Sequence, residues 1–227
     1  MFKIYKIIIL LFLLSFPVPL NAHLQHYDDL NRIEFDIYRN NKHIGKHIFS
    51  FKRSDGQLAV ESEINFEIKK FGIVLYKYHV DGTEIYQNGE LIKFNSKTNQ
   101  NGKQKYVNMK LENGEYIIDG SSYKGKVPKE YLLGTWWNHS IVKTAAQISA
   151  VSGRIIKQKV TFLGRETIKL GDKSYNTLHF NFSSTDKKLD KDKRLNTHVW
   201  YDENTLNWVK ASFNKKGKWE YKLVSMD

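Results

Sequence analysis

The chain has 227 residues, contains no cysteine and carries a formal net charge of +12. Without cysteine it forms neither disulfide bonds nor zinc sites built from thiolates, so packing and hydrogen bonding must hold the fold. Its length suits one domain with a substantial core, once an N-terminal targeting segment is set aside.

Residues 1–22 have the organisation of a secretory signal peptide. Two lysines precede the apolar run Ile7 to Leu14, two prolines follow it, and the segment ends at the small residue Ala22. The alternative is a retained membrane anchor, but the apolar run is too short to span a bilayer. We therefore expect cleavage near Ala22 and a periplasmic or secreted domain, residues 23–227, that is not an integral membrane protein.

The charge of an exported domain indicates which partners it meets. Removing the two lysines of the leader reduces the net charge from +12 to +10. In that compartment a basic surface favours lipid headgroups or another anionic envelope component, and nucleic acid is not expected. The alternative is a lysine-rich surface with no specific partner, because the lysines are scattered along the chain. Oligomeric state is left open.

Alternation of apolar and polar residues predicts strands along almost the whole mature chain. The clearest run is Leu58 to Ile68, where apolar residues alternate with glutamates and Asn65. The expected strands are 33–37, 43–53, 58–68, 76–86, a run between Gly89 and Asn101, 103–112, 115–120, 154–163, 165–170, 173–183, 195–201, 206–214 and 218–224.

Two turn signals organise the central part of the chain. Asn88-Gly89 and Asn101-Gly102 each supply two residues that tolerate a positive φ, as a type I′ hairpin turn requires. They join three extended runs into an antiparallel meander, and most of the remaining chain repeats this pattern.

One stretch reads as a short helix. Ile141, Ala145 and Ile148 are spaced four and three residues apart, and Asn138 or Ser140 is suited to cap the start. We predict a single all-β domain, built as a curled antiparallel meander with one short helix. It is either an open or partly closed barrel or a two-layer sandwich.

The sequence shows no catalytic constellation. Glu84 shares its strand parity with apolar residues, but a second carboxylate at a defined spacing is missing, and there is no nucleophile elbow. His43 and His47 are predicted to share a strand face, too far apart for one ion. We therefore expect no catalytic residue, no metal and no cofactor.

Large aromatic residues mark a candidate ligand site. If the sheet curls, its concave face must be filled, and the predicted helix covers only part of it. We predict an apolar groove roofed by this helix and able to accept an acyl chain. The candidate ligand-binding residues are Tyr76, Tyr78, Glu84, Phe94, Trp136, Trp137 and Trp200.

Four segments resemble an uncharacterised family of exported bacterial β proteins, the domain-of-unknown-function family 6134. They are 35–51 (FDIYRNNKHIGKHIFSF), 84–103 (EIYQNGELIKFNSKTNQNGK), 135–138 (TWWN) and 199–213 (VWYDENTLNWVKASF). The resemblance covers almost the whole mature chain and includes a distant similarity to the lipoprotein-carrier half-barrel fold. It implies a fold, and it transfers neither a reaction nor a catalytic residue.

Three functions remain open at this point. The first is an exported, non-enzymatic β domain that binds an apolar or amphipathic ligand or a cell-envelope component. The alternative is a structural or protein-interaction module with a packed interior. The third is an enzyme acting on envelope glycans, which requires Glu84 to face a second acid in a pocket.

Overall fold

The computed structural model describes residues 27–190 and 193–227, and these form one all-β unit. Its strands are β1 Arg32–Arg39, β2 Lys42–Ser54, β3 Gln57–Lys70, β4 Ile73–Gln87, β5 Glu90–Gln100, β6 Lys103–Glu112, β7 Glu115–Gly120, β8 Lys124–Pro128, β9 Leu132–Leu133, β10 Ala146–Ile148, β11 Ile155–Leu170, β12 Lys173–Ser184, β13 Asn196–Asp202, β14 Trp208–Asn214 and β15 Lys218–Met226. The predicted signal peptide lies outside the described residues. Among the described residues, no helix is long and apolar enough to cross a membrane.

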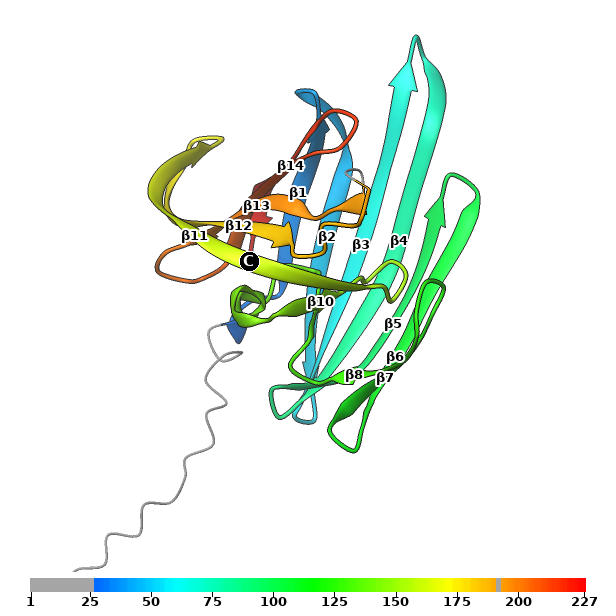
Figure 1. The fold of residues 1–227 in the computed structure, drawn as a ribbon. Coiled ribbons are helices and arrows are strands. Elements are labelled where there is room, and N and C mark those ends of the chain that lie inside the picture. Colours follow the sequence, from blue (N-terminus) through cyan, green and yellow to red (C-terminus); the bar gives the residue numbers. More distant parts are fainter. Residues whose placement is uncertain (1–26, 191–192) are drawn as a thin grey trace, which may run out of the picture.

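All fifteen strands belong to one sheet, which is built almost entirely from sequential antiparallel hairpins. Its order is β8-β7-β6-β5-β4-β3-β2-β1-β15-β14-β13-β12-β11-β10-β9. The first and last strands pair at the centre, so the two halves of the chain form two arms that curl toward each other (Figure 1). The predicted curled meander is confirmed, in its open-barrel form, because no strand ladder joins the edge strands β8 and β9.

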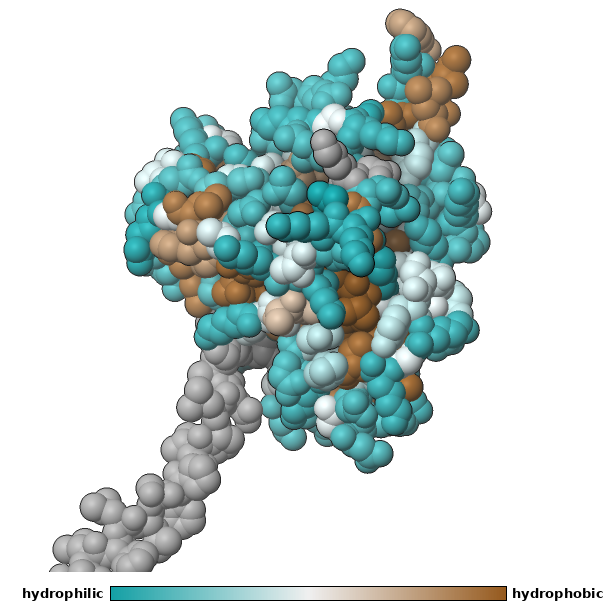
Figure 2. All heavy atoms as spheres, viewed as in Figure 1, coloured by the Kyte–Doolittle hydropathy of each residue, from teal (hydrophilic) through white to brown (hydrophobic). Residues whose placement is uncertain are grey.

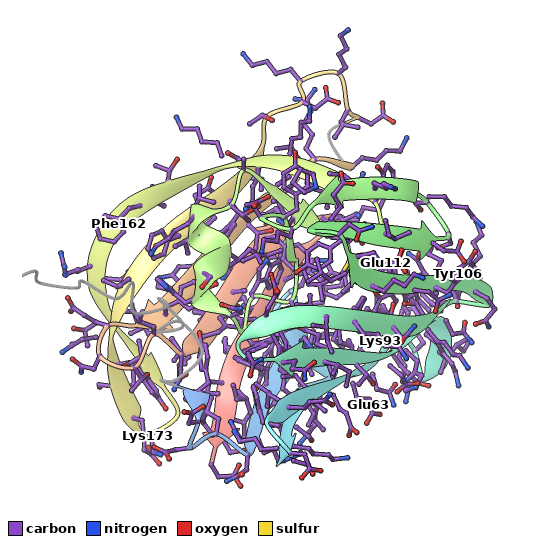
Figure 3. The ribbon with its side chains drawn as sticks, turned by 90° about the horizontal axis from the view of Figure 1, so that it is seen from below. Glu63, Lys93, Tyr106, Glu112, Phe162 and Lys173 are labelled. Atoms are coloured by element: carbon purple, nitrogen blue, oxygen red, sulfur yellow. The ribbon has the colours of Figure 1, made fainter. Side chains whose placement is uncertain are left out.

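The arms meet through loops rather than through a ladder. The amide of Ser122, beyond β7, donates to the carbonyl of Ser152 over 2.9 Å, and Ser152 lies in the turn between β10 and β11. The hydroxyl of Ser96 on β5 donates to the carbonyl of Ala150 in the same turn. Viewed from below, Phe162 on one arm and Tyr106 on the other lie on opposite sides of a centre filled with side chains (Figure 3).

Alternation places one face of each strand in the core. In β1, Ile33, Phe35 and Ile37 are buried while the residues between them are partly exposed. We call the face that carries such residues the inner face. The largest fully buried side chains are Trp137, Trp208, Tyr27, Tyr116, Tyr201, Phe35, Phe49, Phe94, Phe182, Ile33, Ile37 and Ile118.

Both predicted Asn-Gly turns are confirmed. Asn88 and Gly89 have φ of 50° and 77°, and Gln87 pairs directly with Glu90. The turn at Asn101-Gly102 has the same geometry, with φ of 51° and 89°. Positive φ at both central positions is the signature of a type I′ turn, whose twist matches that of the flanking strands.

The predicted helix is present only as a short 3₁₀ helix, η2 His139–Lys143, and its expected extent is wrong. Asn138 caps it as predicted, because its side chain accepts a hydrogen bond from the amide of Ser140. Ala146–Ile148 is strand β10, which pairs with β11 on one side and, in parallel, with β9 on the other. Tertiary pairing therefore overrides the three-four spacing of this segment.

Two further strand predictions differ from the structure. Gly164 does not end a strand, because β11 passes through it with a bulge between Phe162 and Gly164. Glycine permits this bend at φ 131°, so one long strand replaces the two expected. The short strands β8 and β9 were not expected at all, since Val127-Pro128 reads as the end of the regular pattern.

A bulge also corrects the prediction for His43 and His47. The pairing of β1 with β2 shifts register between Ile37 and Tyr38, which reverses the side-chain alternation of β2. His47 is buried on the inner face, while His43 is exposed and lies 3.1 Å from Asp36 on the other face. The two imidazoles therefore do not share a face.

Candidate functional site

An open cavity of about 530 Å³ lies at the ends of strands β11 to β14. Its lining combines apolar side chains with basic ones and contains no carboxylate among the described residues. The residues that line it are Trp136, Arg154, Ile156, Ser183, Ser184, Lys193, Arg194, Leu195, Asn196, Thr197, Phe213, Asn214 and Lys215. We call this the basic cavity.

The basic side chains come from segments far apart in the sequence. Arg154 precedes β11 and Lys215 follows β14, and both line the cavity. Lys105, on the inner face of β6 in the opposite arm, is not part of the lining but lies close enough to both to feel their charges. Burial lowers the pKa of Lys105, and the nearby positive charges of Lys103, Lys215 and Arg154 lower it further. Cations gathered from both arms therefore repel one another, and a bound anion would relieve this repulsion.

A second cavity, of about 690 Å³, differs from the basic cavity in the charges of its lining. It lies against the Asn88-Gly89 turn and is lined by Glu90 and Glu130 as well as by Lys129. Lys129 donates to Glu90 over 2.7 Å, so the charges there are already paired within the protein. In the basic cavity Lys193 pairs with Asp190 over 2.7 Å, but the described lining itself contains no carboxylate.

Trp136 lines the basic cavity and has an unusual backbone. Its φ is 61°, a left-handed conformation that costs free energy for a bulky side chain. The hydroxyl of Tyr201 holds this conformation by donating to the carbonyl of Trp136 over 3.0 Å. The indole N–H of Trp136 is buried and has no acceptor among the described residues. The ring of Trp136 therefore contributes an apolar surface to the cavity, held in place by the contact with Tyr201.

An aromatic row connects two other predicted site residues to this cavity. Tyr76 and Tyr78 both stack on Phe66, with ring centroids 6.1 and 4.8 Å away. Phe66 contacts Trp219 edge-on at 5.3 Å, and Trp219 stacks at 5.8 Å on Phe213, which lines the cavity. The row thus leads from Tyr76 and Tyr78 to Phe213, which lines the basic cavity together with Trp136.

Glu84 lies deeper, in the filled centre of the curl. Its carboxylate accepts hydrogen bonds from the hydroxyl of Tyr86 over 2.5 Å and from the indole of Trp137 over 3.0 Å. Burial raises the pKa of Glu84, although these hydrogen bonds oppose the shift. Of the other candidate residues, Trp137 and Phe94 are fully buried, so the centre of the inner face is packed.

Trp200 lies on the opposite face of the sheet. Its neighbours Val199 and Tyr201 point into the core, so alternation directs Trp200 outward, where His179 stacks on it at 4.1 Å. The ammonium of Lys210 lies 4.6 Å from the centre of its ring. The structure therefore separates Trp200 from the other candidate residues.

The outer face around Trp200 carries a hydrogen-bonded chain that the sequence did not reveal. Nδ1 of His179 lies 2.9 Å from the carboxylate of Glu166, and its Nε2 lies 2.9 Å from Nδ1 of His198. The indole of Trp200 donates to the same carboxylate over 2.6 Å. Strand register brings these residues together. In the described part of the chain, no group of three histidine, aspartate or glutamate residues is arranged to hold a metal ion.

Lys105, Arg154 and Lys215 were also missed by sequence reasoning. A local signal exists for Lys105, because it shares its parity with the buried Val107 and Met109. A lysine on the apolar face of a strand is unusual unless that strand end faces solvent or a ligand. No local pattern identifies Arg154 or Lys215, because their meeting with Lys105 depends on how the arms curl.

Comparisons with known proteins agree with this fold. The model of a family described as "Domain of unknown function (DUF6134)" matches residues 35–224. No curated protein matches the chain. The fold is similar to the crystal structure of a β-barrel-like protein of domain of unknown function DUF1849 from Brucella abortus. The TM-score is 0.61 at 12% identity, covering 87% of this chain and 97% of that one. At this identity the likeness concerns the fold alone.

Proposed function

This chain belongs to the DUF6134 family, and we propose that it is an exported, non-enzymatic β domain whose basic cavity binds an anionic amphipathic molecule of the cell envelope. The anionic group would lie among Lys105, Arg154 and Lys215. The apolar part would contact Trp136, Ile156 and Phe213.

The observation that carries this proposal is the convergence of cations from both arms on a cavity without a carboxylate in its described lining. Bringing like charges together on one inner surface is unfavourable in the absence of an anion. Guanidinium and ammonium groups bind phosphate or carboxylate through charge-assisted hydrogen bonds, which are stronger than neutral ones. A negatively charged head group would offset the repulsion.

The size and lining of the cavity support an amphipathic ligand rather than a free inorganic ion. Its volume of about 530 Å³ falls within the range typical of small-molecule sites. Aromatic and aliphatic side chains form part of its wall, and the aromatic row continues from Phe213 toward Tyr76. An apolar chain could follow this row, as an acyl chain would.

The surroundings of Glu84 argue against the glycan-acting enzyme. Its side chain is 2% exposed, and its hydrogen-bond partners are a phenol and an indole rather than a second acid. A hydrolytic pair requires two carboxyl groups separated by a space for the substrate. Glu84 instead joins β4 to the segment that carries Trp137.

Because the centre of the inner face is packed, a protein-interaction module remains the alternative function. Trp137 contacts Phe51, Tyr86 and Tyr27 edge-on, which fills the space where the sequence predicted an open groove. A ligand would therefore lie in the basic cavity and along the aromatic row, and not in the centre of the curl. If the cavity binds nothing, the module becomes the better description.

Binding of a simple amphiphile tests the proposal. We would titrate a chain beginning at His23, which keeps every described residue, with dodecyl phosphate and with dodecyltrimethylammonium as the cationic counterpart. Saturable binding of the phosphate alone is expected. Replacing both Lys105 and Lys215 with glutamine should weaken it about tenfold, because each removes a charge-assisted contact.

Lys93→Gln provides the matched control, because Lys93 is an exposed lysine on the opposite face of the first arm. It should leave dodecyl phosphate binding unchanged. Equal affinity for both amphiphiles, or equal loss in the control and the double variant, would contradict a specific anionic site.

A further inference from the structure

The tip of the β3–β4 hairpin exposes a cluster of large apolar side chains. Phe71 is 92% exposed, Ile73 66%, Leu75 55% and Val74 37%. These four residues account for most of the exposed large hydrophobic side chains among the described residues, and the brown tip at the upper right of Figure 2 shows them projecting from the body. A contiguous exposed apolar patch of this kind marks an interaction surface.

The tip stands clear of the rest of the sheet. Pairing of β3 with β2 begins at Phe66, and pairing of β4 with β5 begins at Tyr78. The ribbon from Glu67 to Tyr76 therefore has no neighbouring strand on either side, as Figure 1 shows. Four residue pairs at the usual strand rise extend it by about 13 Å. The apolar side chains thus reach away from the protein surface.

The first residue of the turn, Phe71, has a strained backbone conformation, and packing of its side chain does not compensate for this strain. Phe71 and Gly72 have φ of 51° and 80°, the same geometry as four other two-residue turns. Those four place Asp55, Asn88, Asn101 and Asn113 at the first position, residues that tolerate this conformation. Phenylalanine does not, and its exposed ring makes little contact within the protein. Unrelieved strain at an exposed residue indicates a function.

The lysines around the tip indicate a partner with a negatively charged surface. Lys69, Lys70 and Lys77 surround the apolar residues, and Glu67 is the acidic residue of the same ribbon, 3.0 Å from both Lys69 and Lys77. Lys70 lies 5.4 Å above the ring of Phe71. Lys70 lies across the ribbon from Ile73, and Lys69 lies across from Val74, so lysines flank the apolar side chains. Their long stems let the ammonium groups reach back to the surface, which suits the boundary between acyl chains and anionic headgroups of a bilayer.

We propose that the β3–β4 tip docks onto bilayers that contain anionic phospholipid, inserting Phe71, Ile73 and Leu75 below the headgroups. The lysines contact the lipid phosphates, in keeping with the net charge of +10 that remains after the two leader lysines are subtracted from +12. This docking rests on residues outside the basic cavity and does not require a ligand there. Because the aromatic row begins at Tyr76, docking would place its outer end next to the membrane.

Vesicle flotation tests the docking directly. The chain beginning at His23 is mixed with vesicles of phosphatidylcholine alone, or of phosphatidylcholine and phosphatidylglycerol in equal parts. We expect the protein to float with the anionic vesicles and to be released as salt is raised, because salt screens the lysine–phosphate attraction. Phe71→Asn should reduce the partition coefficient at least about tenfold, since it removes a large apolar side chain from the interface.

Phe71→Asn is an informative variant because asparagine occupies this position in three of the four other turns. It should leave Tm unchanged or raise it, so lost binding would not reflect unfolding. Phe162→Asn is the matched control, because Phe162 is 49% exposed on another part of the surface. It should float like the unmodified chain.

Three results would overturn the proposal. One is failure of the unmodified chain to float with anionic vesicles, and another is equal flotation of Phe71→Asn. The third is concentration-dependent self-association without vesicle binding, abolished by Phe71→Asn, which would show that the tip docks onto a second copy of the chain. None of these results bears on dodecyl phosphate binding, so the cavity proposal is judged separately.

Discussion

Nε1 of Trp137 donates a hydrogen bond to Oε1 of Glu84 over 3.0 Å, and the two residues are 53 positions apart in the chain. The bond ties β4 to the segment that leads into η2. The hydroxyl of Tyr86 occupies the other carboxylate oxygen. A single buried carboxyl group thus satisfies two buried donors that would otherwise be costly to bury.

This arrangement predicts opposite effects for two substitutions of Glu84. Glu84→Leu should destabilise the fold at every pH by about 2–4 kcal/mol, because the phenol and the indole each lose their acceptor. Glu84→Gln keeps an acceptor oxygen and removes the titrating group. Urea unfolding at a series of pH values would measure both.

The pH dependence follows from the direction of the shift. Burial raises the pKa of Glu84 above its ordinary 4.5, so the folded state binds this proton more readily than the unfolded state. Stability is therefore complete below pH 4.5 and decreases as the pH rises from 4.5 toward the folded pKa. As the pH rises from 4.5 toward the folded pKa, the stability of Glu84→Gln should increase relative to that of the unmodified chain. Parallel pH profiles for the two proteins would disprove the shift.

The buried imidazole of His47 should make the folded protein less stable in acid. Burial among aromatic rings lowers its pKa from 6.5 to about 3, so the folded state resists protonation. The stability it contributes is complete above pH 6.5 and falls by about 1.4 kcal/mol per pH unit toward pH 3. His47→Phe should have a flatter acid limb in urea unfolding. His43→Gln, at an exposed position, should retain the full slope.

The sequence predicts this fold best where local geometry decides it. Asn88-Gly89 and Asn101-Gly102 specify turns by their own φ preferences, and alternation correctly placed Glu84 on the inner face. The short segment Ala146–Ile148 could not be assigned from its spacing, since partners on both sides determine its structure.

The candidate site was predicted only in part, for a related reason. Tyr76, Tyr78 and Trp136 entered the candidate set because large aromatic residues stand out in a sequence and strand parity can be read from it. The cations Lys105, Arg154 and Lys215 meet across the two arms, and parity gives no information about how strongly a sheet curls. Trp200 lies on the other face from these residues, because adjacent strand residues point in opposite directions.

Two glycines should respond to alanine for different reasons. At Gly45 an added Cβ would lie 2.0 Å from the carbonyl oxygen of Asn65 and 2.5 Å from Cα of Phe66. At Gly89 nothing lies within 4 Å, but φ is +77°. Gly45→Ala should therefore separate β2 from β3 and cost more than about 3 kcal/mol, whereas Gly89→Ala should cost about 1–2 kcal/mol.

Thermal unfolding of both variants would measure this difference. Gly56→Ala has the same open surroundings and a φ of +74°, so it should match Gly89→Ala. A Gly45→Ala protein as stable as the Gly89→Ala protein would show that the β2–β3 contact relaxes easily.

The closure of the two arms depends on Gly120 and Gly153, which pack against each other. A Cβ at Gly120 would lie 2.7 Å from the carbonyl oxygen of Ser152, the acceptor of the Ser122 amide. Gly120→Ala should therefore push the β10–β11 turn away from the first arm. The amide of Ser122 should then exchange with solvent faster, while amides in the central β1–β15 ladder keep most of their protection. Gly114→Ala, on the same arm but with nothing within 4 Å, should destabilise its own turn at φ +78° without loosening the Ser122 amide, so it serves as the control. Hydrogen exchange read at single residues would decide the outcome, and unchanged protection at Ser122 would mean that the arms are held together elsewhere.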